Sequence, residues 1–533
     1  MSNANNGRAD VLTGAVSWIR RVLAWCGLLL ICWMTASAAF AQLDHIRAAA
    51  QLLSQGQRDE AEREARLAMQ DPSTKALAWS MLGSIRLEEG KYQESTQFLT
   101  KALELNPNLS GAWTTLGDSY VLQNKGALAS ESFEKALKLD PANNQARYDL
   151  AKLDASLHHY QKSLDEARPL LAQLIKSDDG LLILGTDYAG LAEKQELIGV
   201  VHDWQDLPHP SDESSVEFGQ LLIGCGMIPE AKVVIAAVES RSAGQMSWTV
   251  ARDLGRAYLG LDDLDLAERN FDVGLSLNPA CAACDQGLAD IADQRGDTEH
   301  ALAYLVKAKQ LEPEDPEILF AFGKICLKRN LIEDALPALG KAVSLKPDDD
   351  RYLYVFGSAN VARGNLPKAA ALFGQLLQKR PRDPILNYAV GTVYYLQGKY
   401  TDAESAFKKS LADQPDQVAA PYYLSLTYSH LGKNDEAEAL LRGLVKSHPE
   451  YAPSYVKLGT MLMTKHDYPE AQEYLERAII LDSSSEQAHY QLYLLFQTLG
   501  KPAEAQQHFA EWQKLQADAH ARKHLELHLL LPN

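Results

Sequence analysis

The sequence lacks the motifs that mark the commonest enzyme chemistries. It contains no glycine-rich loop that ends in Lys-Ser or Lys-Thr, and it contains no His-Glu-x-x-His. Phosphate binding and zinc-dependent hydrolysis of the kinds that these motifs serve are therefore not indicated. Gly224-Cys225-Gly226 is short and has none of the residues that should follow it. We therefore do not expect an enzyme, and we expect no cofactor and no bound metal.

Positive charge is also scarce. Lys and Arg together number 52 against 70 Asp and Glu, which gives a formal net charge of −18. The basic residues form only short groups, such as Lys379-Arg380-Pro381-Arg382. An acidic chain repels phosphate backbones, so nucleic acid is not an expected partner.

Charge is absent from one stretch near the amino terminus. Arg20 and Arg21 precede an uncharged run that ends in Ala39-Phe40-Ala41, which has the small-x-small form of a cleavage site. We predict that residues 1–41 are an export signal and that the protein resides in the periplasm or cell envelope. The alternative is an uncleaved anchor in the inner membrane, since about 20 apolar residues can span a bilayer. Any membrane contact would then be made through residues 22–41.

Cysteine is rare, with six residues in 533, but two of them lie close together. Cys281 and Cys284 follow Pro279 at the expected start of a helix. In an exported protein such a pair can oxidise to a disulfide, and a helix amino terminus lowers the pKa of a thiol. An inert disulfide or buried thiols, a metal site and a redox couple all remain open. Asp285 occupies the place where haem attachment needs histidine.

What the sequence has in abundance is a repeat of 34 residues. Small residues recur with this period, as do alanines and prolines at other places in the repeat. The spacing is longer by two residues once. The small residues are Gly83, Gly117, Ala151, Gly185 and Gly219, then Gly255, Ala289, Gly323, Gly357, Gly391, Ser425 and Gly459. A fixed period of this length is typical of a solenoid rather than a single-core globule.

The pattern of each repeat predicts two helices, as residues 384–417 illustrate. An apolar stripe with helical spacing runs through the first half of this unit and ends at Gly398, a residue that suits the end of a helix. The second half presents Ala403 and Phe407 on one face and stops before Pro415. Gly391 and Ala403 are small, which predicts that the two helices cross closely there.

The pattern resembles the tetratricopeptide repeat family. Residues 110–143 carry its residue types at the set places, and residues 248–281 do so with Gly274 where alanine is usual. The matching residues of the first unit are Trp113, Leu116, Gly117, Tyr120, Ala129, Phe133, Ala136 and Pro141. The resemblance implies an all-α, right-handed superhelical solenoid of about fourteen antiparallel helix pairs over residues 42–519. The predicted units start at 42, 76, 110, 144, 178, 212, 248, 282, 316, 350, 384, 418, 452 and 486.

The predicted units are unequal. Those in 144–247 are degenerate, and those in 248–485 are regular. The two-residue shift falls at 239–247, where we expect either a bend or hinge or a simple loop insertion. Residues 520–533 are expected to form a capping helix, because the end of an array needs a closing element. A dimer contact through Leu529–Leu531 is the alternative.

The resemblance also implies that the first helices line a concave face that receives peptides. The fifth place of successive units points there in the family. In this chain that place holds Phe320, Tyr354, Tyr388, Tyr422, Val456 and Tyr490. Aromatic side chains are rigid anchors for a partner; the alternative is that they pack neighbouring helices together.

The family's clamp for carboxyl-terminal tails cannot be assembled here. Arg252, Arg256 and Lys324 are candidates for the inner face, but the required asparagines are missing. The sequence therefore predicts a non-catalytic scaffold or adaptor that binds protein or peptide segments on its concave face, in envelope assembly or secretion. The alternative is a thiol-based redox or metal-binding periplasmic protein that uses Cys281 and Cys284.

Overall fold

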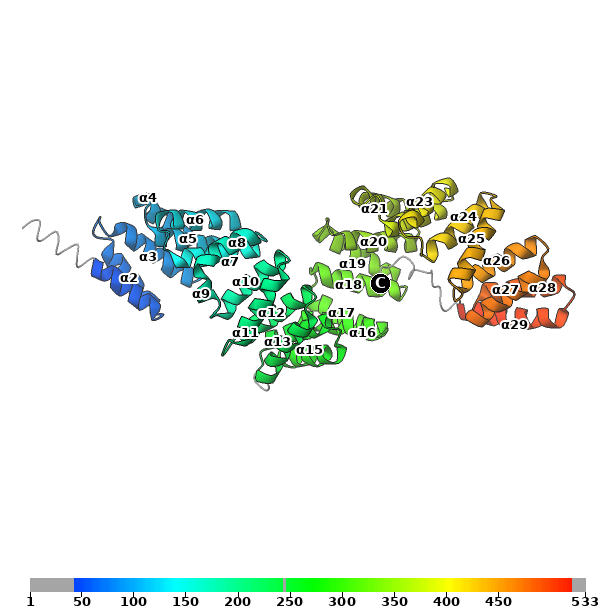
Figure 1. The fold of residues 1–533 in the computed structure, drawn as a ribbon, viewed down its shortest axis with the longest axis horizontal. Coiled ribbons are helices and arrows are strands. Elements are labelled where there is room, and N and C mark those ends of the chain that lie inside the picture. Colours follow the sequence, from blue (N-terminus) through cyan, green and yellow to red (C-terminus); the bar gives the residue numbers. More distant parts are fainter. Residues whose placement is uncertain (1–42, 243–245, 520–533) are drawn as a thin grey trace, which may run out of the picture. The chain divides into compact units, whose positions relative to one another are not determined.

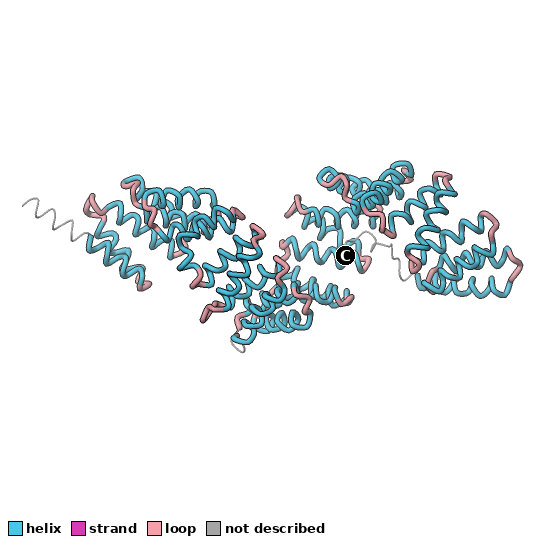
Figure 2. Tube along the Cα trace, viewed as in Figure 1, coloured by secondary structure: helices cyan, strands magenta, loops and turns pink. Residues whose placement is uncertain are grey.

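The computed structural model describes residues 43–242 and 246–519, and it confirms the all-α prediction. No strand occurs among those residues (Figures 1 and 2). The predictions made for 1–41 and for 520–533 lie outside the described residues. The chain divides into two compact units, with the boundary between Gln245 and Met246. This boundary falls inside the predicted 239–247 segment, and a hinge there stays a prediction.

Unit 1 begins with a helix over residues 43–54 and continues through alternating first and second helices. Its helices are α2 (Arg58–Ala68), α3 (Lys75–Glu88), α4 (Tyr92–Leu105), α5 (Ser110–Val121), α6 (Gly126–Leu139), α7 (Asn144–Ser156), α8 (Tyr160–Ala167), η1 (Arg168–Leu170), α9 (Leu171–Leu174), α10 (Asp178–Gly190), α11 (Lys194–Gln205), α12 (Asp212–Gly224) and α13 (Ile228–Arg241).

Between residues 246 and 519, unit 2 contains eight helix pairs without interruption. They are α14 (Trp248–Gly260), α15 (Leu264–Leu277), α16 (Ala282–Gln294), α17 (Thr298–Leu311), α18 (Pro316–Lys328), α19 (Ile332–Leu345), α20 (Asp350–Arg363), α21 (Leu366–Lys379), α22 (Pro384–Leu396), α23 (Tyr400–Asp413), α24 (Ala419–His430), α25 (Asn434–Ser447), α26 (Ala452–Thr464), α27 (Tyr468–Leu481), α28 (Glu486–Thr498) and α29 (Pro502–Ala519).

The helices follow the predicted register. From α3 onward, the first helix of every pair begins at the predicted unit start or within one residue of it. The pairing persists through 144–247, where the sequence pattern is weak. The departure there is local: Pro169 has no amide proton to donate, and the chain passes from α8 into η1 and α9 around it. Within each unit, first helices also contact the first helix of the next pair, as α18 and α20 do.

The turn inside every pair has the same backbone form. Its left-handed residue recurs with the repeat from Gly56 to Gly500, and in six described turns it is a residue other than glycine. The next residue donates its amide proton to a carbonyl five residues back, as Lys399 N does to Tyr394 O at 2.9 Å. This bond satisfies a carbonyl at the end of the first helix, as a Schellman motif does. Each hairpin therefore closes through its own backbone.

In many of the pairs, the two helices meet where a large side chain of the second helix covers a glycine of the first. A Cβ added at Gly391 would lie 2.7 Å from Cδ1 of Phe407, and one at Gly117 would lie 2.4 Å from the Phe133 ring. Both phenylalanines are fully buried. The close crossing predicted at Gly391 is thus present, and the side chain that requires it is Phe407.

Replacing Gly391 with alanine should destabilise unit 2 by about 1–3 kcal/mol, because the buried Phe407 ring would have to shift. The matched control is Gly374→Ala in the middle of α21, where an added Cβ meets nothing within 4 Å. That change should stabilise the helix by up to about 1 kcal/mol. Urea unfolding followed by circular dichroism measures both. Equal shifts in the same direction would contradict this account of the crossing.

A buried carboxyl group joins three helices of unit 1. Asp187 on α10 is fully buried, and its Oδ2 lies 2.6 Å from the Ser163 hydroxyl, which also lies 2.9 Å from the carbonyl oxygen of Ala151. One hydroxyl proton cannot serve both acceptors. Burial raises the pKa of Asp187 to about 7; the hydrogen bond with Ser163 opposes this rise, and nearby Asp154 adds to it. A protonated Asp187 can donate to Ser163, which then donates to Ala151.

This arrangement predicts that unit 1 loses stability as the pH rises. Because the folded-state pKa lies above the value of about 4 expected in an unfolded chain, the folded state binds the extra proton between about pH 4 and pH 7. Its stabilising effect is lost as the pH rises through that range. The urea midpoint should therefore be higher at pH 5 than at pH 8, and Asp187→Asn should reduce the difference. The exposed Asp165→Asn, on α8, should leave the difference unchanged; equal behaviour of the two variants would refute the assignment.

Candidate peptide-binding surface

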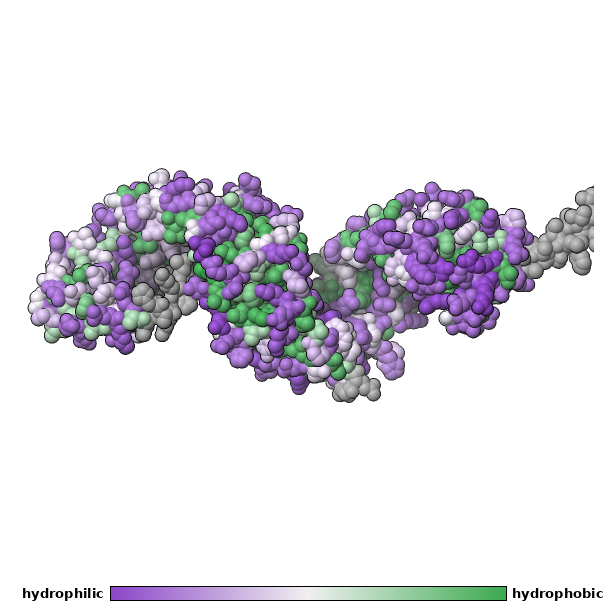
Figure 3. All heavy atoms as spheres, turned by 180° about the vertical axis from the view of Figure 1, so that it is seen from behind, coloured by the Kyte–Doolittle hydropathy of each residue, from purple (hydrophilic) through white to green (hydrophobic). Residues whose placement is uncertain are grey.

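A surface hollow of about 550 Å³ lies over the first helices α18, α20 and α22 of unit 2. We call it the α18–α22 hollow. Its lining residues are Phe320, Lys324, Asp350, Arg351, Tyr354, Val355, Arg380, Asp383, Ile385 and Leu386. In the view of Figure 3, hydrophobic residues gather over this part of unit 2 among more hydrophilic surroundings. Two of the predicted binding residues, Phe320 and Tyr354, lie in the hollow.

The apolar part of the hollow has a fixed base and one accessible aliphatic side chain. Val355 and Leu386 are almost fully buried, whereas Ile385 is 49% exposed. Phe320 is half-buried, and its ring stacks on that of Tyr352 with the centroids 4.7 Å apart. The packed residues hold the surface in place, so a partner would not have to order it on binding.

Ion pairs surround this apolar part. Arg380 lies 2.9 Å from Asp383 and 3.4 Å from Asp350. Arg351 lies 3.0 Å from Glu317 and 2.7 Å from Asp349. The hydrogen bond to Asp349 is the largest cause of a raised pKa at Arg351. The pairs of Arg351 link one repeat to the next, those of Arg380 lie within one repeat, and together they fix both arginines at the edge of the hollow.

The predicted aromatic residues fall into two groups. Tyr354, Tyr388 and Val456 are less than 10% exposed. The Tyr354 ring packs 5.5 Å from that of Phe373, and the Tyr388 ring packs 6.0 Å from that of Phe407. Burial is the main cause of a raised pKa at Tyr354. This environment matches the packing alternative, although Tyr354 still contributes to the lining of the hollow.

The other three positions are more accessible but are not brought together. Phe320 lies in the α18–α22 hollow. Tyr422 is half-buried, with its ring 5.5 Å from that of Tyr451. Tyr490 is 37% exposed on α28, where its ring lies 5.2 Å from that of Trp512 on the last helix. A single exposed ladder is therefore not what these residues form.

The second place of the repeat was overlooked in the sequence. It holds Glu317, Arg351 and Ile385 at steps of 34 residues, and each of them lies in the hollow or pairs with a residue that does. Comparing the residues at this place in successive repeats, as was done for the fifth place, would have identified them. Lys324, a candidate for the inner face, does line the hollow.

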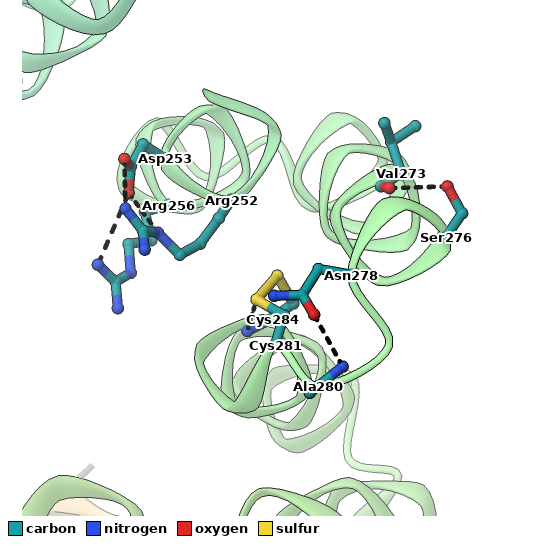
Figure 4. Close-up of a disulfide and its surroundings, with 9 residues drawn as sticks. All are labelled: Arg252, Asp253, Arg256, Val273, Ser276, Asn278, Ala280, Cys281 and Cys284. Atoms are coloured by element: carbon teal, nitrogen blue, oxygen red, sulfur yellow. Dashed lines mark hydrogen bonds and ion pairs between the residues drawn. A yellow bond between two sulfur atoms is a disulfide. The ribbon is translucent and has the colours of Figure 1, made fainter. Parts of the chain in front are cut away.

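Cys281 and Cys284 form a disulfide at the start of α16 (Figure 4). Both residues are buried, and the amide of Cys284 donates to Sγ of Cys281 at 3.1 Å. The other two described cysteines are free: Cys225 is exposed, and Cys326 is buried. Burial raises the pKa of the Cys326 thiol to about 12, which makes it a poor nucleophile.

Family models described as tetratricopeptide repeat match residues 76–109, 114–181, 252–317, 292–355 and 394–461. The chain belongs to the tetratricopeptide repeat family. No protein with a curated description matches it. Among solved structures, this tetratricopeptide repeat chain is similar to the Cut9–Hcn1 hetero-tetramer of the APC/C, at 13% identity and a TM-score of 0.47 over 85% of this chain and 96% of that one.

Two further solved structures are similar at lower scores. YrrB, titled a tetratricopeptide repeat protein with an unusual peptide-binding site, is 20% identical with a TM-score of 0.32, over 35% of this chain and 95% of that one. Yeast Tom70 is 15% identical with a TM-score of 0.33, over 91% and 97%.

Two kinds of feature are absent from the described part of the tetratricopeptide repeat array. Within 43–242 and 246–519, no group of three or more His, Cys, Asp and Glu side chains is placed to hold a metal ion. No described helix is long and apolar enough to cross a membrane.

The disulfide accounts for a departure from the tetratricopeptide pattern. Gly274 on α15 stands where the family usually has alanine, and a Cβ there would lie 2.9 Å from Sγ of Cys284. The nearest other atoms to that Cβ are backbone atoms at 3.7 Å. The sulfur therefore fills the space that the usual methyl group would take.

A double-mutant cycle should reveal this packing. In the disulfide-bonded protein, Gly274→Ala should destabilise unit 2 by about 1–3 kcal/mol through overpacking. In a Cys281→Ala, Cys284→Ala background, the same change should cost less or stabilise, because the sulfur is gone and alanine favours a helix. Urea midpoints of the four proteins give the coupling. An equal cost in both backgrounds would rule out the sulfur as the cause.

Proposed function

We propose that this tetratricopeptide repeat chain is a non-catalytic scaffold that binds a peptide segment of a partner protein in the α18–α22 hollow. The observation that carries the proposal is the exposed Ile385 beside a base of buried side chains. Partner anchors bind best in such preformed, largely apolar surfaces with a few fixed polar groups.

The repeat architecture supports a scaffold rather than an enzyme. Apart from η1 and α9, paired helices occupy the described helical sequence, and no separate body is present there to hold a catalytic pocket. A thiol-based activity at Cys281 and Cys284 is the alternative function. It is disfavoured because both residues are buried, whereas reactive thiols are partly exposed.

We place the scaffold in the cell envelope, in assembly or secretion. The support for this place is the leader-like sequence of residues 1–41, with its paired arginines, apolar run and Ala-Phe-Ala ending. A disulfide also suits an oxidising compartment outside the cytosol.

The hollow can be tested with a phage-displayed library of random dodecapeptides selected on the immobilised full chain. We expect enriched peptides that bind wild type and lose about tenfold in affinity for Ile385→Gln, because a polar group replaces an aliphatic contact worth about 1–2 kcal/mol. Fluorescence anisotropy with the labelled peptides measures the affinities.

Leu396→Gln is the matched control. Leu396 lies at the other end of α22 and is 48% exposed, against 49% for Ile385, but it is not part of the hollow. Binding to this variant should equal binding to wild type. Enriched peptides that bind Ile385→Gln as tightly as wild type would show that the α18–α22 hollow is not the binding site.

A further inference from the structure

We infer that the α18–α22 hollow selects a partner segment in which an acidic residue stands beside an apolar one, and that Lys324 binds the acidic side chain. This inference rests on the proposed function and assigns the partner's chemistry. It depends on which charges around the hollow are already paired and which retain bonding capacity.

The carboxylates of the hollow are already neutralised. Asp350 and Asp383 are the two acidic lining residues. Arg380 lies within ion-pair distance of both, and Lys379 donates a hydrogen bond to Asp350 at 2.8 Å. A basic partner would have to displace these cations before it could use either carboxylate, so the hollow does not favour a basic segment.

Arg351 is similarly occupied. Its guanidinium makes hydrogen bonds to Asp349 at 2.7 and 3.2 Å and to Glu317 at 3.0 Å. Neither carboxylate is among the lining residues. Arg351 thus directs Nε and Nη2 to two neighbouring carboxylates at 2.7 to 3.2 Å, and it is more strongly paired than Lys324.

Lys324 has the weakest pairing of the three lining cations. Its Nζ lies 3.8 Å from Asp293, the limit of an ion pair, while Lys328 holds both oxygens of the same carboxylate at 2.6 and 2.7 Å. The side chain of Lys324 is 31% exposed. An ammonium group has three donors, so Lys324 retains the capacity to bind a carboxylate supplied by a partner.

The carboxylate of Asp290 also interacts with Lys324, but it does not take the place of a carboxylate supplied by a partner protein. Asp290 on α16 is half-buried, and burial raises its pKa to about 6 while Lys324 lowers it. No ion pair links Asp290 to Lys324 among the described residues. Asp290 therefore adds negative potential near the lysine without occupying its donors.

The lysine and the apolar surface are adjacent on one helix. Phe320 and Lys324 are four residues apart on α18, which places them on the same face one turn apart, and both line the hollow with Ile385. A partner that places an aliphatic or aromatic side chain against Phe320 and Ile385 brings its neighbouring side chain toward Lys324. A carboxylate there would form a charge-assisted hydrogen bond.

The experiment exchanges the charge on each side of this contact. Peptides enriched on wild type are synthesised with each acidic residue replaced in turn by Gln or by Lys, and their affinities for wild type, Lys324→Met and Lys324→Glu are measured. At one acidic position of the peptide, replacement by Gln should weaken its affinity for wild type about tenfold. The same replacement should change its affinity for Lys324→Met little. At that position Lys324→Glu should prefer Lys.

Lys409→Glu is the control for net charge. Lys409 is exposed on α23 and lies outside the hollow, so this variant should bind every peptide as wild type does. A similar loss for Lys409→Glu and Lys324→Glu would attribute the effect to overall charge and overturn the inference.

The remaining outcomes separate the two proposals. Peptides that require Ile385 but show no acidic position coupled to Lys324 would overturn the inference and leave the peptide-binding function standing. Enrichment that yields no peptide sensitive to Ile385→Gln would overturn both.

Discussion

The contact that the rest of the structure depends on is that between a large side chain of one helix and a glycine of its partner. Where Phe133 covers Gly117 and Phe407 covers Gly391, no Cβ can fit between the helices. In the hairpins that have it, this contact sets how closely the two helices pack. Hairpins with similar distances between their helices can stack in a regular register. The layer of first helices that carries the α18–α22 hollow follows from that regular stacking.

The array supplies a position for function but does not determine the function. Equivalent places on α18, α20 and α22 differ in residue type: Glu317, Arg351 and Ile385 occupy the same place in successive repeats. The hollow combines a packed base, an exposed aliphatic residue and a lysine with a distant ion-pair partner. Its chemistry therefore comes from departures from the repeat, as expected of a site built on a common fold.

The sequence predicted the hairpins well because their determinants are local and recur. Small residues, prolines and left-handed turn positions lie at fixed intervals, so the starts of the helices could be read from spacing even in 144–247. Exposure could not be read in this way. Tyr354 and Phe320 share one place in the repeat, yet Tyr354 is buried against Phe373 whereas Phe320 is half-buried. Such differences depend on side chains of neighbouring hairpins that the period does not encode.

The state of the cysteine pair was undetermined for a similar reason. The spacing of Cys281 and Cys284 fitted several chemistries, and the spacing alone did not show that the two sulfurs are bonded to each other. Gly274 was visible in the sequence as a departure from the family pattern, but its meaning required the position of the Cys284 sulfur. Departures from a repeat are thus easier to detect than to interpret without neighbouring atoms.

The self-closing turn has a consequence for how such a chain can change in length. Each turn satisfies its carbonyl within one hairpin, as Lys399 does with Tyr394, and the left-handed residues keep their step of 34 except between Gly226 and Asp262. The two additional residues therefore fall outside any intra-hairpin turn. A gene encoding this protein can gain or lose whole hairpins by unequal recombination without breaking a turn, whereas insertions within a hairpin would shift the crossing of its helices.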